Sequence, residues 1–198
     1  RMFLERGDVE SLIEMEKHVE RATKEIATFH PTAIAFGCTT GSLVMGVGYD
    51  ERIIKKIEGI AKVPATTTST AAIKALKKFG LKKISVATPY IKELDEKEKI
   101  FLEGHGFEVL NMKGMEILDA AKIVDVSPYV VYRFAKGAVH PSSEGLFISC
   151  TSFRTFEILE ALEKDLGIPV VSSNQATVWD ALKLAGIDEK VNGYGRLL

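Results

Sequence analysis

One order of segments occurs twice in this chain of 198 residues. In each copy, a short apolar run ends at a Cys-Thr pair. A helical pattern, a proline-containing apolar run, a Ser/Thr-rich turn and an Ala-rich helical pattern then follow. The first copy places Cys38 after residues 33–36, and the second places Cys150 after residues 146–149. Because each copy reads as strand, helix, strand and helix, the repetition predicts two similar α/β lobes related by an approximate twofold axis.

Other apolar runs continue the alternation of strands and helices. They lie at residues 63–65, 82–87, 107–112 and 168–171. Strands that alternate with helices are typical of parallel sheets, whose ligands bind beyond the C-terminal ends of the strands. Both cysteines fall at such ends, so we expect them on opposite walls of one cleft. The apolar period of residues 9–29 predicts a single amphipathic helix before the first cysteine.

The charge balance and the hydropathy exclude several classes of protein. The chain carries 26 Lys and Arg against 27 Asp and Glu, so no global field attracts it to nucleic acid or to an anionic membrane. No apolar run approaches the roughly 20 residues that span a bilayer, and the start does not read as a signal peptide. We therefore expect a cytoplasmic protein with neither a nucleic-acid partner nor a membrane partner.

The two cysteines, Cys38 and Cys150, are too far apart in sequence for a C-x-x-C redox pair, and they are too few for a four-cysteine zinc site. Two inert, buried thiols are one interpretation. The shared Cys-Thr context at two strand ends favours a functional role instead. A cysteine between a strand and a helix lies near helix-terminal N–H groups, which stabilise a thiolate and lower its pKa. We therefore expect two reactive thiols.

Hydroxyl groups adjoin both thiols, since Thr39 and Thr40 follow Cys38, and Thr151 follows Cys150. Ser and Thr at helix starts are normally N-caps, which is how we interpret most of residues 66–70 and 172–174. The threonines beside the thiols are better candidates for ligand contacts. The four histidines show no metal-ligand spacing. Two thiols among neutral donors suit a small carboxylate that gains or loses a proton at carbon.

Four segments resemble the aspartate/glutamate racemase superfamily, and within it the maleate cis-trans isomerase and arylmalonate decarboxylase branch. They read A-F-G-C-T-T-G-S, V-A-T-P-Y, I-S-C-T-S-F-R-T and I-P-V-V-S-S-N-Q-A. The resemblance implies an α/β fold of two Rossmann-like, parallel-sheet lobes, an active site in the cleft between them, and neither a metal nor an organic cofactor. We assign residues 1–80 and 174–198 to the first lobe and residues 81–173 to the second. The superfamily begins with a strand and a loop that this sequence lacks, so we expect the first lobe without its N-terminal strand.

The resemblance also implies roles for single residues. It makes Cys38 and Cys150 the catalytic pair. The positions that hold the substrate carboxylate are Thr39, Thr40, Tyr90 and Thr151. The decarboxylase has glycine at the first cysteine position, so Cys38 favours isomerase or racemase chemistry. Ala120 stands where the isomerases carry Asn, which removes one amide contact to the substrate.

We therefore expect a cofactor-independent two-cysteine isomerase of a small dicarboxylate, similar to maleate cis-trans isomerase, which assembles as a homodimer or larger homo-oligomer. Three alternatives stay open. One is a racemase of amino acids or hydantoins that uses the two thiols as acid and base. The others are an arylmalonate decarboxylase-like enzyme and a non-catalytic carboxylate-binding protein. Arg154 is either a ligand of a second carboxylate or a surface residue.

Overall fold

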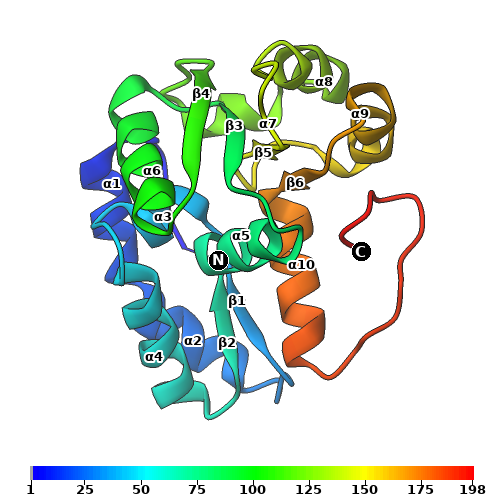
Figure 1. The fold of residues 1–198 in the computed structure, drawn as a ribbon. Helices are drawn as coiled ribbons and strands as arrows, with labels where there is room; N and C mark the ends of the chain where they lie inside the picture. The colour runs from blue at the N-terminus through cyan, green and yellow to red at the C-terminus, as the bar shows by residue number, and fades with distance from the viewer. Residues whose placement is uncertain (1) are drawn as a thin grey trace.

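The computed structural model describes residues 2–198, which form two parallel sheets surrounded by helices (Figure 1). The smaller sheet pairs β1 (Ile34–Phe36) with β2 (Ala65–Thr67). The larger sheet has the strand order β4-β3-β5-β6. Its strands are β3 (Lys83–Thr88), β4 (Glu108–Gly114), β5 (Gly145–Ile148) and β6 (Val170–Ser172). The expected α/β fold with parallel sheets is confirmed, while the division of the chain into lobes at residues 80 and 174 stays a prediction.

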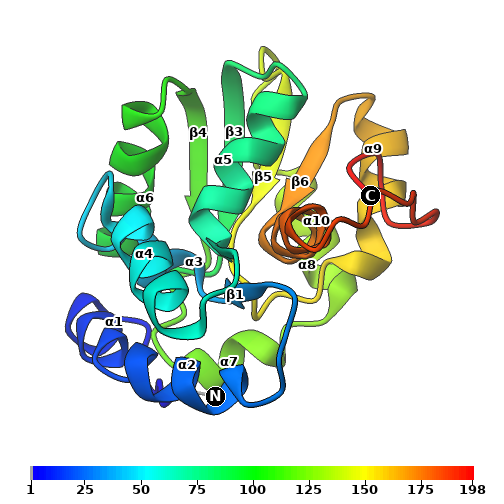
Figure 2. The same ribbon diagram turned by 90° about the horizontal axis from the view of Figure 1, so that it is seen from below.

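The helices occupy the connections between these strands. In chain order they are α1 (Val9–Glu16), α2 (Val19–Ala27), α3 (Thr39–Leu43), α4 (Tyr49–Ala61), α5 (Thr68–Lys78), α6 (Lys92–Gly104), α7 (Ala120–Val124), α8 (Pro128–Lys136), the 3₁₀ helix η1 (Phe156–Ile158), α9 (Leu159–Leu166) and α10 (Ser173–Leu184). Figure 2 shows α5 and α10 on one face of the larger sheet, with α6 beside β4 and α9 beside β6. Among residues 2–198, no helix is long and apolar enough to cross a bilayer.

The single helix expected over residues 9–29 was wrong, because α1 ends at Glu16 and α2 begins at Val19. The N–H groups of Lys17 and His18 bond to carbonyls three residues back, which tightens the last turn of α1 and ends it. The apolar period continues across the break, and Met15 and Val19 are both buried. Periodicity alone therefore did not reveal the interruption. As a result, α1 packs on α3 while α2 packs on α4.

The predicted repeat is visible in matching hydrogen bonds. In the first copy, Glu58 Oε1 accepts a hydrogen bond from the N–H of Ala65, the first residue of β2, at 3.1 Å. In the second copy, Glu163 Oε1 accepts one from the N–H of Val170, the first residue of β6, at 3.0 Å. In both cases, a glutamate near the end of a helix fixes the start of the following strand.

The two helix ends match as well. Lys62 ends α4 and Gly167 ends α9, both in the left-handed conformation, with φ of 58° and 70°. A proline follows two residues later in each copy. The carbonyl of Pro64 accepts the N–H of Ile34 at the start of β1, and that of Pro169 accepts the N–H of Leu146, the second residue of β5, each at 3.0 Å. In both copies, the same succession of turns therefore places the second strand beside the first, β2 beside β1 and β6 beside β5.

The repeat ends at two helices that meet in the middle of the molecule. Thr67 lies opposite Phe36 in the smaller sheet, and Ser172 lies opposite Ile148 in the larger sheet. Thr67 and Ser172 are also the N-caps of α5 and α10. These two helices pack against each other, between the sheets in Figure 1. The C-terminal ends of β1 and β5 therefore converge at the N-terminal ends of this helix pair.

Candidate active site

Cys38 lies two residues beyond β1 and is the N-cap of α3. Its Sγ accepts a hydrogen bond from the N–H of Gly41 at 3.4 Å. A Cβ added to Gly41 would lie 2.9 Å from this sulfur and 2.5 Å from Met15 Cε. Only glycine at position 41 therefore allows the helix backbone to approach the thiol this closely without a shift of its neighbours.

Cys150 lies two residues beyond β5 and is buried. Its Sγ accepts a hydrogen bond from the N–H of Ser152 at 3.4 Å, and its own N–H donates to Ser173 Oγ at 3.0 Å. The backbone of Cys150 has φ of +96°, a conformation that side chains with a Cβ rarely adopt. The second cysteine is therefore held in a strained turn, as is common at functional sites.

The two cysteine loops are linked through Ser173, whose Oγ accepts the N–H of Cys150 and lies 2.9 Å from the hydroxyl of Thr39, the residue after Cys38. Burial raises the pKa of Cys38 to about 11; the Gly41 N–H opposes the rise, and the nearby Cys150 adds to it. Burial also raises the pKa of Cys150, against the lowering effect of the Ser152 N–H. The expectation of lowered thiol pKa values was therefore wrong, because the loss of hydration outweighs the helix-terminal N–H groups.

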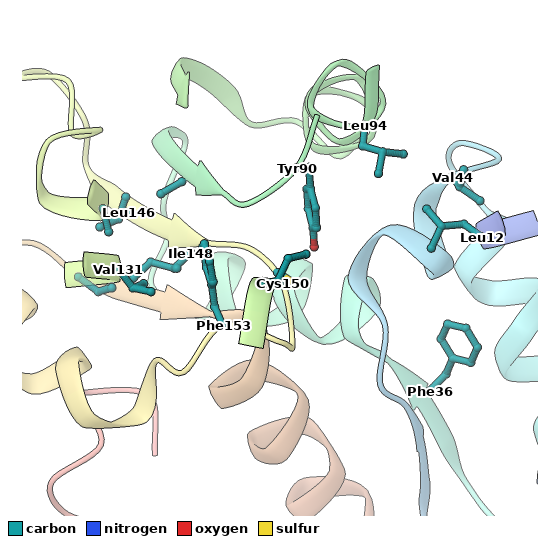
Figure 3. Packing of buried hydrophobic residues seen from close by; sticks show 14 of the residues in the cluster. Leu12, Phe36, Val44, Tyr90, Leu94, Val131, Leu146, Ile148, Cys150 and Phe153 are labelled. Atoms are coloured by element: carbon teal, nitrogen blue, oxygen red, sulfur yellow. The ribbon is translucent and has the colours of Figure 1, made fainter. Parts of the chain in front are cut away.

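Tyr90 completes the surroundings of Cys150. It follows β3 and is 4% exposed, and in Figure 3 its hydroxyl points at Cys150. A hydrogen bond from this hydroxyl lowers the pKa of Cys150. Burial raises the pKa of Tyr90 well above its usual value, and the charges of Cys150, Glu98 and Cys38 act in the same direction. The phenol is therefore a neutral donor throughout the physiological pH range.

The predicted threonines lie at the same place and connect the two cysteine loops. Thr39 Oγ1 is 2.9 Å from Ser173 Oγ, and Thr151 Oγ1 donates to the carbonyl of Gly37 at 3.1 Å. The hydroxyl of Thr40 bonds to Cys38 and lowers its pKa. The structure brings all three threonines to the thiols, and their contact with a substrate stays a prediction.

Ser173 is a site residue that the sequence analysis grouped with the expected caps of residues 172–174. The sequence suggested caps over residues 172–174, and Ser172 is indeed the cap of α10. The next hydroxyl, that of Ser173, lies between the loops, where it accepts from Cys150 and pairs with Thr39. The repeat held a signal, since Thr68 occupies the same place after β2 and its hydroxyl donates to the carbonyl of Phe36, the last residue of β1.

A pocket of about 1090 Å³ opens beside Cys38. Its walls are largely apolar and include Met15, Val19, Ile34 and Phe36. Thr151, Asp119 and Ala120 also line it. The pocket thus connects the first thiol to a largely apolar space.

Two further features of the structure concern Arg154 and the side chains that could bind a metal ion. Arg154 lies in an exposed ion pair with Glu157 at 2.7 Å, which fits the surface interpretation of this residue. Within residues 2–198, no group of three or more His, Cys, Asp or Glu side chains is placed to bind a metal ion.

Glu98 is a residue that the sequence did not single out. It lies on α6 and is fully buried, and its Oε1 lies within hydrogen-bond distance of Ser149 Oγ, at 2.7 Å. Burial raises its pKa to about 8, although the Ser149 hydrogen bond opposes the rise. The sequence of α6 is rich in charged residues, so the sequence alone does not distinguish Glu98 from its exposed neighbours. The helical period of Leu94 and Phe101 places Glu98 on the buried face, and this was the available signal.

Taken together, the fold and the site define a class of α/β proteins in which two cysteines, one beyond a strand of each sheet, share a single site. The profile of the arylmalonate decarboxylase family matches residues 4–198. The chain belongs to this family, which confirms the resemblance found in the sequence.

Known relatives include enzymes of two activities. Arylmalonate decarboxylase of Bordetella bronchiseptica is 29% identical over 96% of this chain and 77% of its own length. Maleate isomerase of Nocardia farcinica is 26% identical over 100% of this chain and 81% of its own length. A maleate isomerase variant from Pseudomonas putida S16, solved with maleate, superposes with a TM-score of 0.96 at 22% identity, over 100% of this chain and 81% of that one. The last comparison shows the shared fold.

Proposed function

We propose that the protein is a cofactor-independent cis-trans isomerase of a small dicarboxylate such as maleate, with Cys38 and Cys150 as its catalytic pair. The observation that supports this most directly is the proximity of the two thiols, each of which lies beyond a strand of a different sheet. A maleate isomerase of Nocardia farcinica has been solved with a covalently bound succinylcysteine intermediate. A cysteine adduct of this kind needs one thiol as nucleophile and a second group as acid.

The proposed reaction begins when the Cys38 thiol loses its proton to solvent, which its raised pKa allows in only a small fraction of the molecules. The resulting thiolate attacks one carbon of the double bond and forms a C–S bond. The electron pair of the double bond moves to the neighbouring carbon, and its carboxylate carries the charge as an enolate. The Cys150 thiol then gives its proton to that carbon. The product is a succinyl thioether, in which the central bond is single and rotates.

Reversal of these steps completes the turnover. The Cys150 thiolate removes a proton from the carbon that it protonated, the C–S bond breaks, and the Cys38 thiolate leaves. The trans diacid results, and both thiols return to their starting states. The neutral donors suit the enolate, because Tyr90 stays protonated and the threonine hydroxyls carry no charge. Cys150, which delivers the proton, is buried, and this limits the competition of water for the carbanion.

The test is incubation of the protein with maleate, with formation of fumarate followed by proton NMR between about pH 6 and about pH 9. We expect fumarate to form, and we expect Cys38→Ser and Cys150→Ser each to lower kcat by at least about a hundredfold. Mass spectrometry of Cys150→Ser should then detect a succinyl group on Cys38. The proposal fails if the intact protein gives no fumarate anywhere in this range.

Decarboxylation of an arylmalonate is the second candidate. It is favoured by the family match and by the apolar walls of the pocket beside Cys38, which offer room for an aromatic ring. In this reaction the C–C bond to one carboxylate breaks, CO₂ leaves, and Cys150 protonates the resulting enolate. Release of CO₂ from phenylmalonate by the unaltered protein, without any from a Cys150→Ser variant, would support this candidate.

A further inference from the structure

A chain of buried polar groups leads from α6 to the second cysteine. Glu98 Oε1 is 2.7 Å from Ser149 Oγ, which lies 3.3 Å from Tyr90 Oη. Figure 3 shows that Tyr90 Oη in turn points at Cys150. Glu98 and Ser149 are each 0% exposed, and Tyr90 is 4% exposed. The chain thus connects a carboxyl group to the thiol without contact with bulk water.

The surroundings of Glu98 favour its neutral form. Its Oε2 is buried without a hydrogen-bond partner among the described residues. An unpaired carbonyl oxygen is far less costly to bury than an unpaired carboxylate oxygen. Asp95, one turn earlier on α6, is also buried and disfavours a second negative charge. Glu98 therefore holds a proton near neutral pH.

The other elements packed against α6 supply no counter-ion. α3 carries no titratable residue. On β4, Glu108 pairs with Lys83, and the ammonium group of Lys113 lies 4.9 Å from the ring centre of Phe134. On α6 itself, Lys92 and Lys99 form exposed pairs with Glu96 and Glu103. Among the described titratable groups, Asp95 is the one whose charge opposes the ionisation of Glu98, and Tyr90 is neutral at physiological pH.

The protonation state of Glu98 decides which way the hydrogens of the chain point. When Glu98 is neutral, its O–H donates to Ser149, the Ser149 hydroxyl donates to Tyr90, and the Tyr90 hydroxyl is left to donate to Cys150. When Glu98 is ionised, Ser149 must donate to the carboxylate instead. Its oxygen then accepts from Tyr90, which turns the phenol hydrogen away from Cys150.

We propose that Glu98 is a positioning residue for Cys150: as a neutral acid it directs the Ser149 and Tyr90 hydrogens so that the phenol donates to Cys150 Sγ, and its ionisation withdraws that hydrogen bond. The inference goes beyond the proposed function, because it concerns the thiol alone and holds for any substrate. As a consequence, the reactivity of Cys150 should rise less steeply with pH once Glu98 is ionised.

The test is the rate of Cys150 alkylation by iodoacetamide as a function of pH, read from the Cys150 peptide by mass spectrometry so that Cys38 is counted separately. The wild-type rate should rise about tenfold per pH unit up to about pH 8 and less steeply above it, as Glu98 ionises and the thiolate loses its donor. In Glu98→Gln the amide still donates to Ser149. Its rate should match the wild type below pH 7 and exceed it several-fold above about pH 8.

Two further variants keep the test decisive. Glu96→Gln changes an exposed carboxylate on the same helix and should leave the profile unchanged. Ser149→Ala removes the hydroxyl that connects Glu98 to Tyr90 while Glu98 itself remains. The change of slope near pH 8 should therefore disappear in this variant, even if Glu98→Gln does not fold. A change of slope that persists in Ser149→Ala, or identical profiles for Glu98→Gln and the wild type, would overturn the proposal. Because no substrate is added, this result is independent of whether maleate is converted.

Discussion

At the scale of single residues, the two cysteines differ in backbone conformation. Cys150 has φ of +96°, whereas Cys38 has φ of −146°, which any residue adopts. A Cβ at a positive φ costs roughly 1 to 2 kcal/mol. We therefore expect Cys150→Gly to unfold at a higher urea concentration than Cys150→Ala, with a free energy of unfolding higher by about 1 kcal/mol.

The first cysteine provides the matched control for this prediction. Cys38 is the N-cap of α3, where glycine is tolerated at least as well as alanine although its backbone is not strained. Cys38→Gly should therefore exceed Cys38→Ala in stability by less than Cys150→Gly exceeds Cys150→Ala. If alanine is the more stable replacement at position 150, the turn at Cys150 is not strained.

Some residues of the site could be predicted from the sequence, and others could not. Cys38, Cys150 and the threonines beside them could be predicted because each follows an apolar strand directly. Glu98 and Ser149 could not, because their roles depend on a tertiary contact between α6 and the end of β5. The thiol pKa values were misjudged for a related reason. Sequence shows the nearby helix start, but it does not show how far burial reduces the hydration of each sulfur.

At the scale of elements, the repeat allows one helix end to be tested against the other. Lys62 and Gly167 end equivalent helices in the left-handed conformation, in which glycine carries no Cβ penalty. Lys62 is exposed. Lys62→Gly should therefore raise the free energy of unfolding by about 1 kcal/mol, measured by urea denaturation.

The reciprocal change tests the same argument. No atom lies within 4 Å of a Cβ added at Gly167, so Gly167→Ala introduces backbone strain without a clash. It should lower the free energy of unfolding by about 1 kcal/mol. A destabilised Lys62→Gly variant would mean that the two helix ends are not equivalent, despite their matching hydrogen bonds.

The order of the helices and strands could be predicted from the sequence in both copies of the repeat. Each copy carries its own strand, turn and cap signals, such as Thr67 and Ser172 before their helices, and these signals act locally. The break between α1 and α2 was not predictable from the apolar period, because the buried face continues through it. The pairing of α5 with α10 is likewise a tertiary outcome.

At the scale of the whole molecule, the buried carboxyl groups make stability depend on pH. The pKa of Glu98 rises from 4.5 to about 8 on folding, and that of Asp95 rises from 3.8 to about 6. The folded protein therefore binds protons that the unfolded chain has lost at the same pH. By linkage, stability falls as the pH rises through this window, and it levels off above the folded pKa.

Glu98 alone dominates the change between about pH 6 and about pH 8, where its folded form is protonated and its unfolded form is ionised. The free energy of unfolding should fall by roughly 2 kcal/mol over this interval, as measured by urea denaturation in buffers of equal ionic strength. Glu98→Gln stays neutral in both states and should remove most of this slope, whereas the exposed Glu96→Gln should keep it. A wild-type protein whose stability is constant or rises over the interval would show that Glu98 is ionised in the folded state. In that case its carboxylate would have to be stabilised by a partner that the chain of hydroxyls does not provide.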